Sequence, residues 1–128
     1  MNDELPPNDH EGRAGRILGV AFTLLLVCIG ALYFLRHQRE SNRAGCIMNL
    51  RNVQQAVRSY QGMNGEDMGD PIDWSQIIGS GKFIEYPPEC PSHGTYTFVD
   101  RHPPIGTLAA ACSHAVELEH HPTSTTGW

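Results

Sequence analysis

One uncharged apolar run constrains this chain more than any other feature of its sequence. Residues 17–35 form a stretch of nineteen amino acids without a charged side chain. As a helix this stretch would be about 28 Å long, at roughly 1.5 Å per residue, which is close to the roughly 30 Å hydrocarbon core of a bilayer. The rest of the 128-residue chain is too small to bury such a helix on all sides. We therefore predict a transmembrane helix over 17–35.

The ends of the run favour a permanent anchor over a cleaved secretory signal. A secretory signal usually has an apolar region of about 7–15 residues that ends in a small-residue cleavage site. Here the run ends in Tyr33, Phe34 and Leu35, and aromatic side chains suit the membrane–water interface. The nearby arginines are Arg13 and Arg16 before the run, and Arg36, Arg39, Arg43 and Arg51 after it. Taken alone, this excess of positive charge after the run predicts a cytoplasmic C-terminal domain.

The remaining sequence divides into a leader, a continued helix, a small domain and a tail. Residues 1–16 are polar and contain Pro-Pro, which predicts a disordered leader. Apolar side chains recur at spacings of three and four in 36–61, so we expect this segment to continue the membrane helix as an amphipathic soluble half. Its predicted packing face consists of Cys46, Leu50, Val53, Val57 and Tyr60. A small domain should follow over 62–114 and a flexible tail over 115–128.

The small domain is expected to contain one short helix and one β-hairpin. Pro71 and the acidic residues around it predict a helix over 71–78. Strand propensity is high in 95–99, and 107–113 can return as the second strand. The predicted fold class is α+β, with a long N-terminal helix, half transmembrane and half soluble, packed on a small antiparallel hairpin.

Composition and charge exclude two classes of function. The formal net charge is −5 and Lys82 is the single lysine, whereas a nucleic-acid-binding protein shows a basic stripe. The sequence between 79 and 82, GSGK, is a turn, because Phe83 stands where a phosphate-binding loop needs Ser or Thr. No nucleophile and base are combined in a recognisable catalytic pattern. We therefore expect no enzyme activity, no catalytic residue, no cofactor, no nucleic-acid partner and no small-molecule substrate.

Two interpretations of Cys90 and Cys112 are open. The two residues bracket the predicted hairpin, and a disulfide between them would close a loop of about 22 residues, worth roughly 3 kcal/mol in the chain-entropy model. Such a bond requires an oxidising compartment. The alternative is a zinc site in which His93 and His114 complete a two-cysteine, two-histidine set. We favour the disulfide, because one residue between Cys112 and His114 is a tight spacing for two ligands.

The other cysteines and histidines carry weaker signals. Cys28 lies inside the apolar run, where it acts as a small hydrophobic residue. Cys46 belongs to the predicted packing face of the soluble helix. His120 and His121 fall in the predicted tail, so we expect both to be solvated.

Several of these segments resemble type IV prepilins and the pseudopilins of type II secretion. The sequence AFTLLLV, from residue 21, is similar to their N-terminal signature. The segments CIMNLR from Cys46, DWSQII from Asp73, CPSHGTYTF from Cys90 and CSH from Cys112 resemble motifs of one pilin-like group, and together the likeness covers about 21–114. The resemblance implies a bacterial inner-membrane protein with a cytoplasmic leader and a periplasmic domain, in agreement with the disulfide. It also implies Ala21 and Phe22 as the candidate processing site.

Two departures from the family pattern bear on function. Ala21 replaces the usual glycine, and Leu26 replaces the glutamate that is thought to set the register of a new pilin subunit. Our leading hypothesis is a structural component of a secretion or pilus-like assembly, whose partners are other pilin-like subunits. The alternatives are an anchored periplasmic binding module that does not polymerise and a small zinc-binding membrane protein on the cytoplasmic side.

Overall fold

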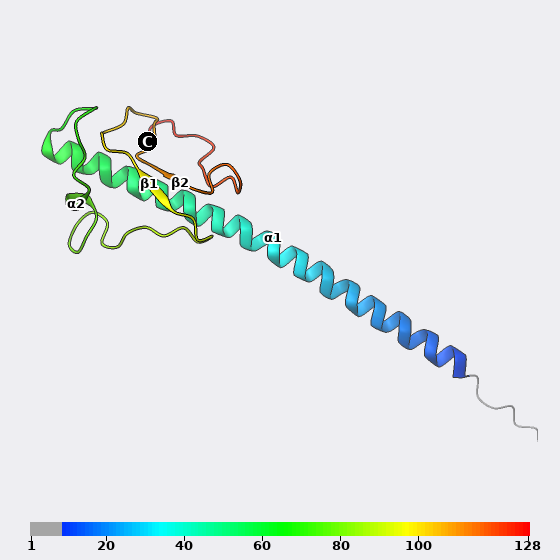
Figure 1. Cartoon of the computed structure of the whole chain (residues 1–128). Coiled ribbons are helices and arrows are strands. Elements are labelled where there is room, and N and C mark those ends of the chain that lie inside the picture. The colour runs from blue at the N-terminus through cyan, green and yellow to red at the C-terminus, as the bar shows by residue number, and fades with distance from the viewer. Residues whose placement is uncertain (1–8) are drawn as a thin grey trace, which may run out of the picture. The chain divides into compact units, whose positions relative to one another are not determined.

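The computed structural model describes residues 9–128, with side chains from Arg13 onward, and shows an α+β chain. Its elements, in order, are helix α1 (Asp9–Asn64), helix α2 (Trp74–Ile77), strand β1 (Tyr96–Phe98) and strand β2 (Ala110–Cys112) (Figure 1). The chain divides into two compact units, Met1–Gln38 and Arg39–Trp128, which are described separately below.

In the first unit, helix α1 contains the whole apolar run. Every large apolar side chain between 17 and 35 is more than half exposed, from 52% for Leu26 to 73% for Tyr33. Within the described residues, this is the one helix that is long and apolar enough to cross a membrane. The predicted helix over 17–35 is therefore confirmed, and it is a candidate membrane span.

The predicted disordered leader differs from the structure where the two can be compared. Part of the range 1–16 lies outside the described residues, but the chain is helical from Asp9 onward. The helix therefore begins before the apolar run, although the leader lacks apolar periodicity.

In the second unit, the last part of α1 supplies much of a small apolar core. On the predicted packing face, Cys46, Leu50, Val53 and Val57 are at most 2% exposed, and Tyr60 is half-buried. Leu50, Val53 and Val57 belong to one buried cluster. Its other members come from α1, from the α2 region and from the start of β2 with the residue before it: Ala56, Ile72, Ile77, Ala109 and Ala110.

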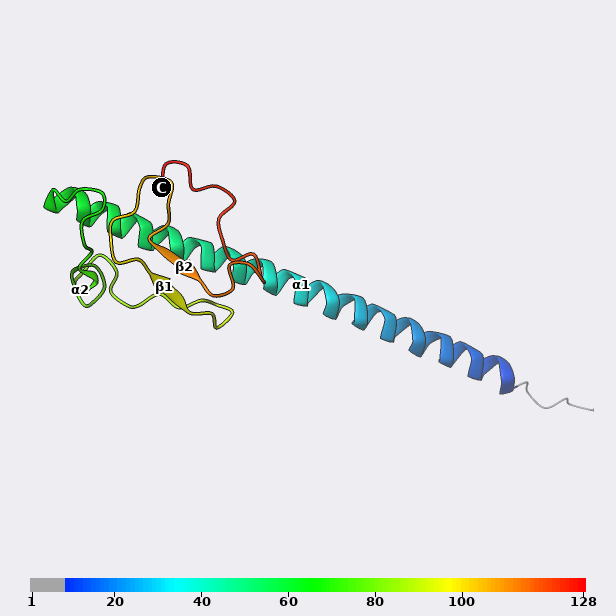
Figure 2. The same ribbon diagram turned by 45° about the horizontal axis from the view of Figure 1, so that its top comes forward.

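The hairpin forms as expected but is shorter. Strands β1 and β2 pair antiparallel, with Tyr96 opposite Cys112 and Phe98 opposite Ala110 (Figure 2). Each strand has three residues, against the predicted ranges 95–99 and 107–113. A two-stranded hairpin of this length is not stable alone in water, so it depends on the packing around it.

Helix α2 is also shorter than predicted, for a tertiary reason. Residues 70–72 pair with the segment after β1 instead of joining the helix: Ile72 N–H donates to the Asp100 carbonyl (2.9 Å) and His102 N–H donates to the Asp70 carbonyl (2.9 Å). The N-cap is therefore Asp73, whose side chain accepts a hydrogen bond from Ser75 N–H (3.0 Å).

Candidate metal centre

Three cysteines and one histidine of the second unit converge in its interior. The cluster consists of Cys46, Cys90, Cys112 and His120, and the four potential ligand atoms all lie within 4.8 Å of one another. The exposed fractions are 0%, 5%, 5% and 1%, in the same order. Each residue comes from a different segment: helix α1, the turn before β1, the end of β2 and the C-terminal segment. We call these four residues the Cys₃His cluster.

Helix α1 places Cys46 in the cluster through its apolar stripe. Cys46 lies one turn before Leu50, so the same face that enters the core brings the thiol to the end of the hairpin. The Tyr96 hydroxyl donates a hydrogen bond to the Cys46 sulfur (3.2 Å). Burial raises the pKa of the Cys46 thiol to about 12, although the hydrogen bond from Tyr96 favours the thiolate.

A tight turn presents Cys90. His93 N–H donates to the Cys90 carbonyl (2.8 Å), and His93 itself has a φ of 61°, a left-handed conformation that is uncommon for a non-glycine residue. This turn directs the backbone N–H groups of Ser92 and Gly94 to the Cys90 sulfur. Burial opposes ionisation of Cys90, but these two hydrogen bonds, with contacts from Cys112 and Cys46, lower the pKa of its thiol.

The hairpin register places Cys112 beside this turn. Cys112 is the last residue of β2 and lies opposite Tyr96, the residue whose hydroxyl contacts Cys46. Ser113 N–H then donates to the Thr95 carbonyl (2.9 Å), and Ala115 N–H donates to the Cys112 carbonyl (3.0 Å). The chain therefore turns immediately after Cys112, which holds its sulfur at the end of the sheet.

The C-terminal segment supplies the fourth member, His120. Its Nδ1 atom lies 3.3 Å from the Cys90 sulfur, and its backbone N–H donates to the His114 carbonyl (3.2 Å). The Arg43 side chain on α1 donates through Nε to the Glu119 carbonyl (2.9 Å), which ties this segment to the helix. Burial, together with the nearby His114 and Arg43, lowers the pKa of His120, which favours the neutral form of the imidazole.

The structure overturns the disulfide predicted between Cys90 and Cys112. Both cysteines are free and their sulfurs are not at bonding distance. The sequence relates Cys90 and Cys112 only through the hairpin that they bracket, whereas the fold brings a third buried thiol, Cys46, and a histidine to the same point. A disulfide joins two thiols, so one of these three would remain unpaired in any internal disulfide.

The alternative zinc set, with His93 and His114, differs from the cluster in both histidines. His93 is exposed in its turn. His114 is half-buried and packs edge-on against His120, with ring centroids 5.8 Å apart, but it is not a member of the cluster. The expectation that His120 is solvated was wrong. Its burial depends on Arg43 and on contacts far along the chain, which local composition does not reveal.

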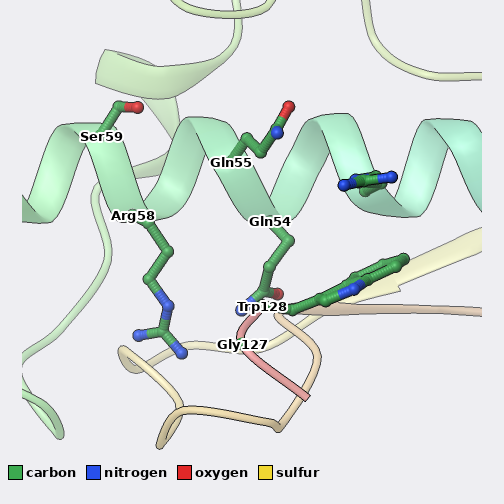
Figure 3. A pocket seen from close by; sticks show the side chains of 7 residues that line it. Gln54, Gln55, Arg58, Ser59, Gly127 and Trp128 are labelled. Carbon is green, nitrogen blue, oxygen red and sulfur yellow. The ribbon is translucent and has the colours of Figure 1, made fainter. Parts of the chain in front are cut away.

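A second polar feature of this unit is a cavity of about 410 Å³ between α1 and the C-terminal residues. Figure 3 shows Gln54 and Arg58 directed toward Gly127 and Trp128, with Gln55 and Ser59 on the other side of the helix. Arg58 donates to the Pro104 carbonyl (3.0 Å), and Gln54 bonds to the hairpin backbone. These groups are used within the fold, so the cavity does not define a second site.

The remaining residues singled out in the sequence lie elsewhere. Ala21 and Phe22 are in the exposed apolar run, as is Cys28. Comparisons of the chain with protein-family models, with curated proteins and with solved structures find no match.

Proposed function

We propose that this chain is a non-enzymatic, single-pass membrane protein that acts structurally, with a pilin-like organisation. The observation that carries the proposal is helix α1. Within one helix, the part from 17 to 35 exposes its apolar side chains, while the part from Cys46 to Val57 supplies the core of a small α+β unit. A pilin-like protein needs this division, because one half of the helix is surrounded by lipid and the other half supports the domain.

In this proposal, the leader is cytoplasmic, the C-terminal unit is periplasmic, and the partners are other pilin-like subunits of a secretion or pilus-like assembly. Support for this topology comes from the sequence resemblance. Because Cys90 and Cys112 are free, a disulfide no longer supports a periplasmic domain. The arginines that follow the apolar run favour the opposite orientation, with the domain in the cytoplasm. Orientation is therefore the property to measure first.

Two measurements on the full chain test the proposal. A reporter fused after Trp128 should be active in the periplasm, whereas a cytosolic reporter would overturn the pilin-like topology. Mass spectrometry of the membrane-extracted protein should find a chain that begins at Phe22. A chain that still carries residues 1–21 would contradict processing by a prepilin peptidase.

Leu26 favours a second candidate function, a periplasmic binding module on a pilin-like scaffold that does not polymerise. No acidic side chain is present between 17 and 35, so the apolar run has no carboxylate that could pair with a neighbouring subunit. Crosslinking from Met48, which is exposed on the soluble part of α1, distinguishes the two functions. Recovery of pilin-like partners would favour the assembly, and crosslinks to unrelated proteins alone would favour the binding module.

The Cys₃His cluster and the arginine distribution favour a third candidate, a zinc-binding membrane protein whose domain is cytoplasmic. Reduced thiols are normal in that compartment. The reporter fused after Trp128 separates this candidate from the other two.

A further inference from the structure

We propose that Cys46, Cys90, Cys112 and His120 bind one Zn²⁺ ion, which holds the C-terminal unit together. The proposal does not depend on the pilin-like function or on the orientation in the membrane. It depends on the donor atoms, on their enclosure and on the groups that contact the sulfurs.

The donor set matches a structural zinc site in type, number and spacing. Structural zinc is four-coordinate and tetrahedral, and three cysteine sulfurs with one histidine nitrogen are a common set. With Zn–S bonds of about 2.3 Å, tetrahedral ligand atoms lie about 3.7 Å apart. The distance from His120 Nδ1 to the Cys90 sulfur is 3.3 Å, and the whole set is within 4.8 Å. Small side-chain movements would therefore place all four atoms around one ion.

The type of donor selects the metal. Ca²⁺ and Mg²⁺ take oxygen ligands, whereas thiolates with imidazole in a tetrahedral arrangement favour zinc. Four protein ligands leave no position for water or substrate, which is the pattern of a structural site and not of a catalytic one. The nearly complete burial of the four residues agrees with this role.

The surroundings of the sulfurs are those of metal-bound thiolates. The backbone N–H groups of Ser92 and Gly94 donate to Cys90, and the Tyr96 hydroxyl donates to Cys46. Such hydrogen bonds from a second layer of groups orient ligands and offset their negative charge. Next to His120 in the chain, Glu119 is held by Arg43, which donates a hydrogen bond to the Glu119 carbonyl and pairs with the Glu119 carboxylate at 3.9 Å.

The ion would join four segments of the unit: α1, the turn before β1, the end of β2 and the C-terminal segment. The apolar core is small, both strands have three residues, and α2 has four. A structural metal adds stability where a small core and short elements supply little of it. Because binding free energy of a structural zinc is folding free energy, removal of the ion should unfold the unit around the cluster.

The first experiment uses the full-length chain in detergent micelles, purified without reductant or chelator. Elemental analysis should give one zinc per chain, and X-ray absorption should show three sulfurs at about 2.3 Å and one nitrogen at about 2.0–2.1 Å. Thiol titration after denaturation without reductant should find all four cysteines free. Two free thiols without zinc, or stoichiometric iron in place of zinc, would overturn the proposal.

Substitutions then test the ligand assignment. Cys112→Ser and His120→Ala should each lose stoichiometric zinc, whereas Cys28→Ser and His93→Asn should retain one zinc per chain, because asparagine tolerates the left-handed conformation at position 93. Retention in His120→Ala together with loss in His93→Asn would show that the assigned histidine is wrong. The X-ray absorption result on the unaltered chain decides the donor set even where a ligand variant fails to fold. Zinc bound in either membrane orientation supports this proposal, so its outcome is separate from that of the reporter.

Discussion

At the scale of single residues, Gly94 shows how closely the Cys90 turn approaches the end of β2. A Cβ atom at this position would lie 2.6 Å from Cδ2 of His114 and 3.0 Å from the Cys112 sulfur. The backbone N–H of the same residue donates to Cys90. A side chain here would therefore push the turn away from the cluster.

We expect Gly94→Ala to destabilise the C-terminal unit by about 1–3 kcal/mol, because overpacking a tight site forces neighbouring groups to move. Thermal unfolding followed by circular dichroism would measure the change. Gly62→Ala is the matched control, because nothing lies within 4 Å of its added Cβ and alanine is favoured over glycine in a helix. Equal stability of Gly94→Ala and the unaltered chain would contradict the close approach.

At the scale of elements, Gln54 links α1 to the hairpin through two hydrogen bonds. Its side chain is 2% exposed. Nε2 donates to the Thr107 carbonyl (3.1 Å), and Oε1 accepts from Ala109 N–H (2.7 Å). One polar side chain on the buried face of a helix thus satisfies a backbone donor and a backbone acceptor just before β2.

Gln54→Ala should lower the free energy of unfolding by about 1–3 kcal/mol, because it removes the partner of the buried Ala109 N–H and of the Thr107 carbonyl. The comparison is Gln55→Ala, whose side chain is exposed on the other side of the helix (Figure 3). Denaturant unfolding of both variants in the same detergent would measure the difference. If the two substitutions have the same effect, the link through Gln54 contributes little.

At the scale of the whole molecule, the exposed apolar run of α1 is a candidate membrane span. Leu26 stands at the middle of 17–35. We expect Leu26→Arg to oppose membrane insertion by about 2.5–3.5 kcal/mol, the cost of a charge at the centre of a membrane helix. The fraction that stays with membranes after alkaline extraction should fall.

Met48→Arg is the control for this experiment, because Met48 is 64% exposed on the part of α1 that belongs to the second unit. This variant should remain in the membrane fraction. Equal extraction of the two variants would argue against 17–35 as the span.

Local pattern predicted several elements of this fold. The helix over 17–35, the apolar stripe from Cys46 to Val57 and the existence of the hairpin follow from periodicity and strand propensity, which act over a few neighbouring residues. The predicted ends of the elements were less accurate. Helix α2 lost its first turn because residues 70–72 pair with the segment after β1, an interaction that local propensity cannot contain.

The Cys₃His cluster could be predicted only in part. Cys90 and Cys112 were recognised as a pair, and Cys46 was placed correctly on the buried stripe. No sequence pattern indicated that the three thiols lie together. The available signal was an odd number of cysteines in the soluble segment, since one thiol must then remain outside any internal disulfide. His120 had no local signal, because it lies in a polar, proline-containing stretch.

The sequence by itself determined that a long helix would carry an apolar stretch of membrane length, because hydrophobicity and helical period are properties of adjacent residues. Only the tertiary structure decided which groups the cysteines lie next to. Their meeting with His120 depends on the register of the hairpin, on the turn at His93 and on the bond from Arg43 to Glu119. These interactions join residues far apart along the chain, so no local sequence pattern could predict them.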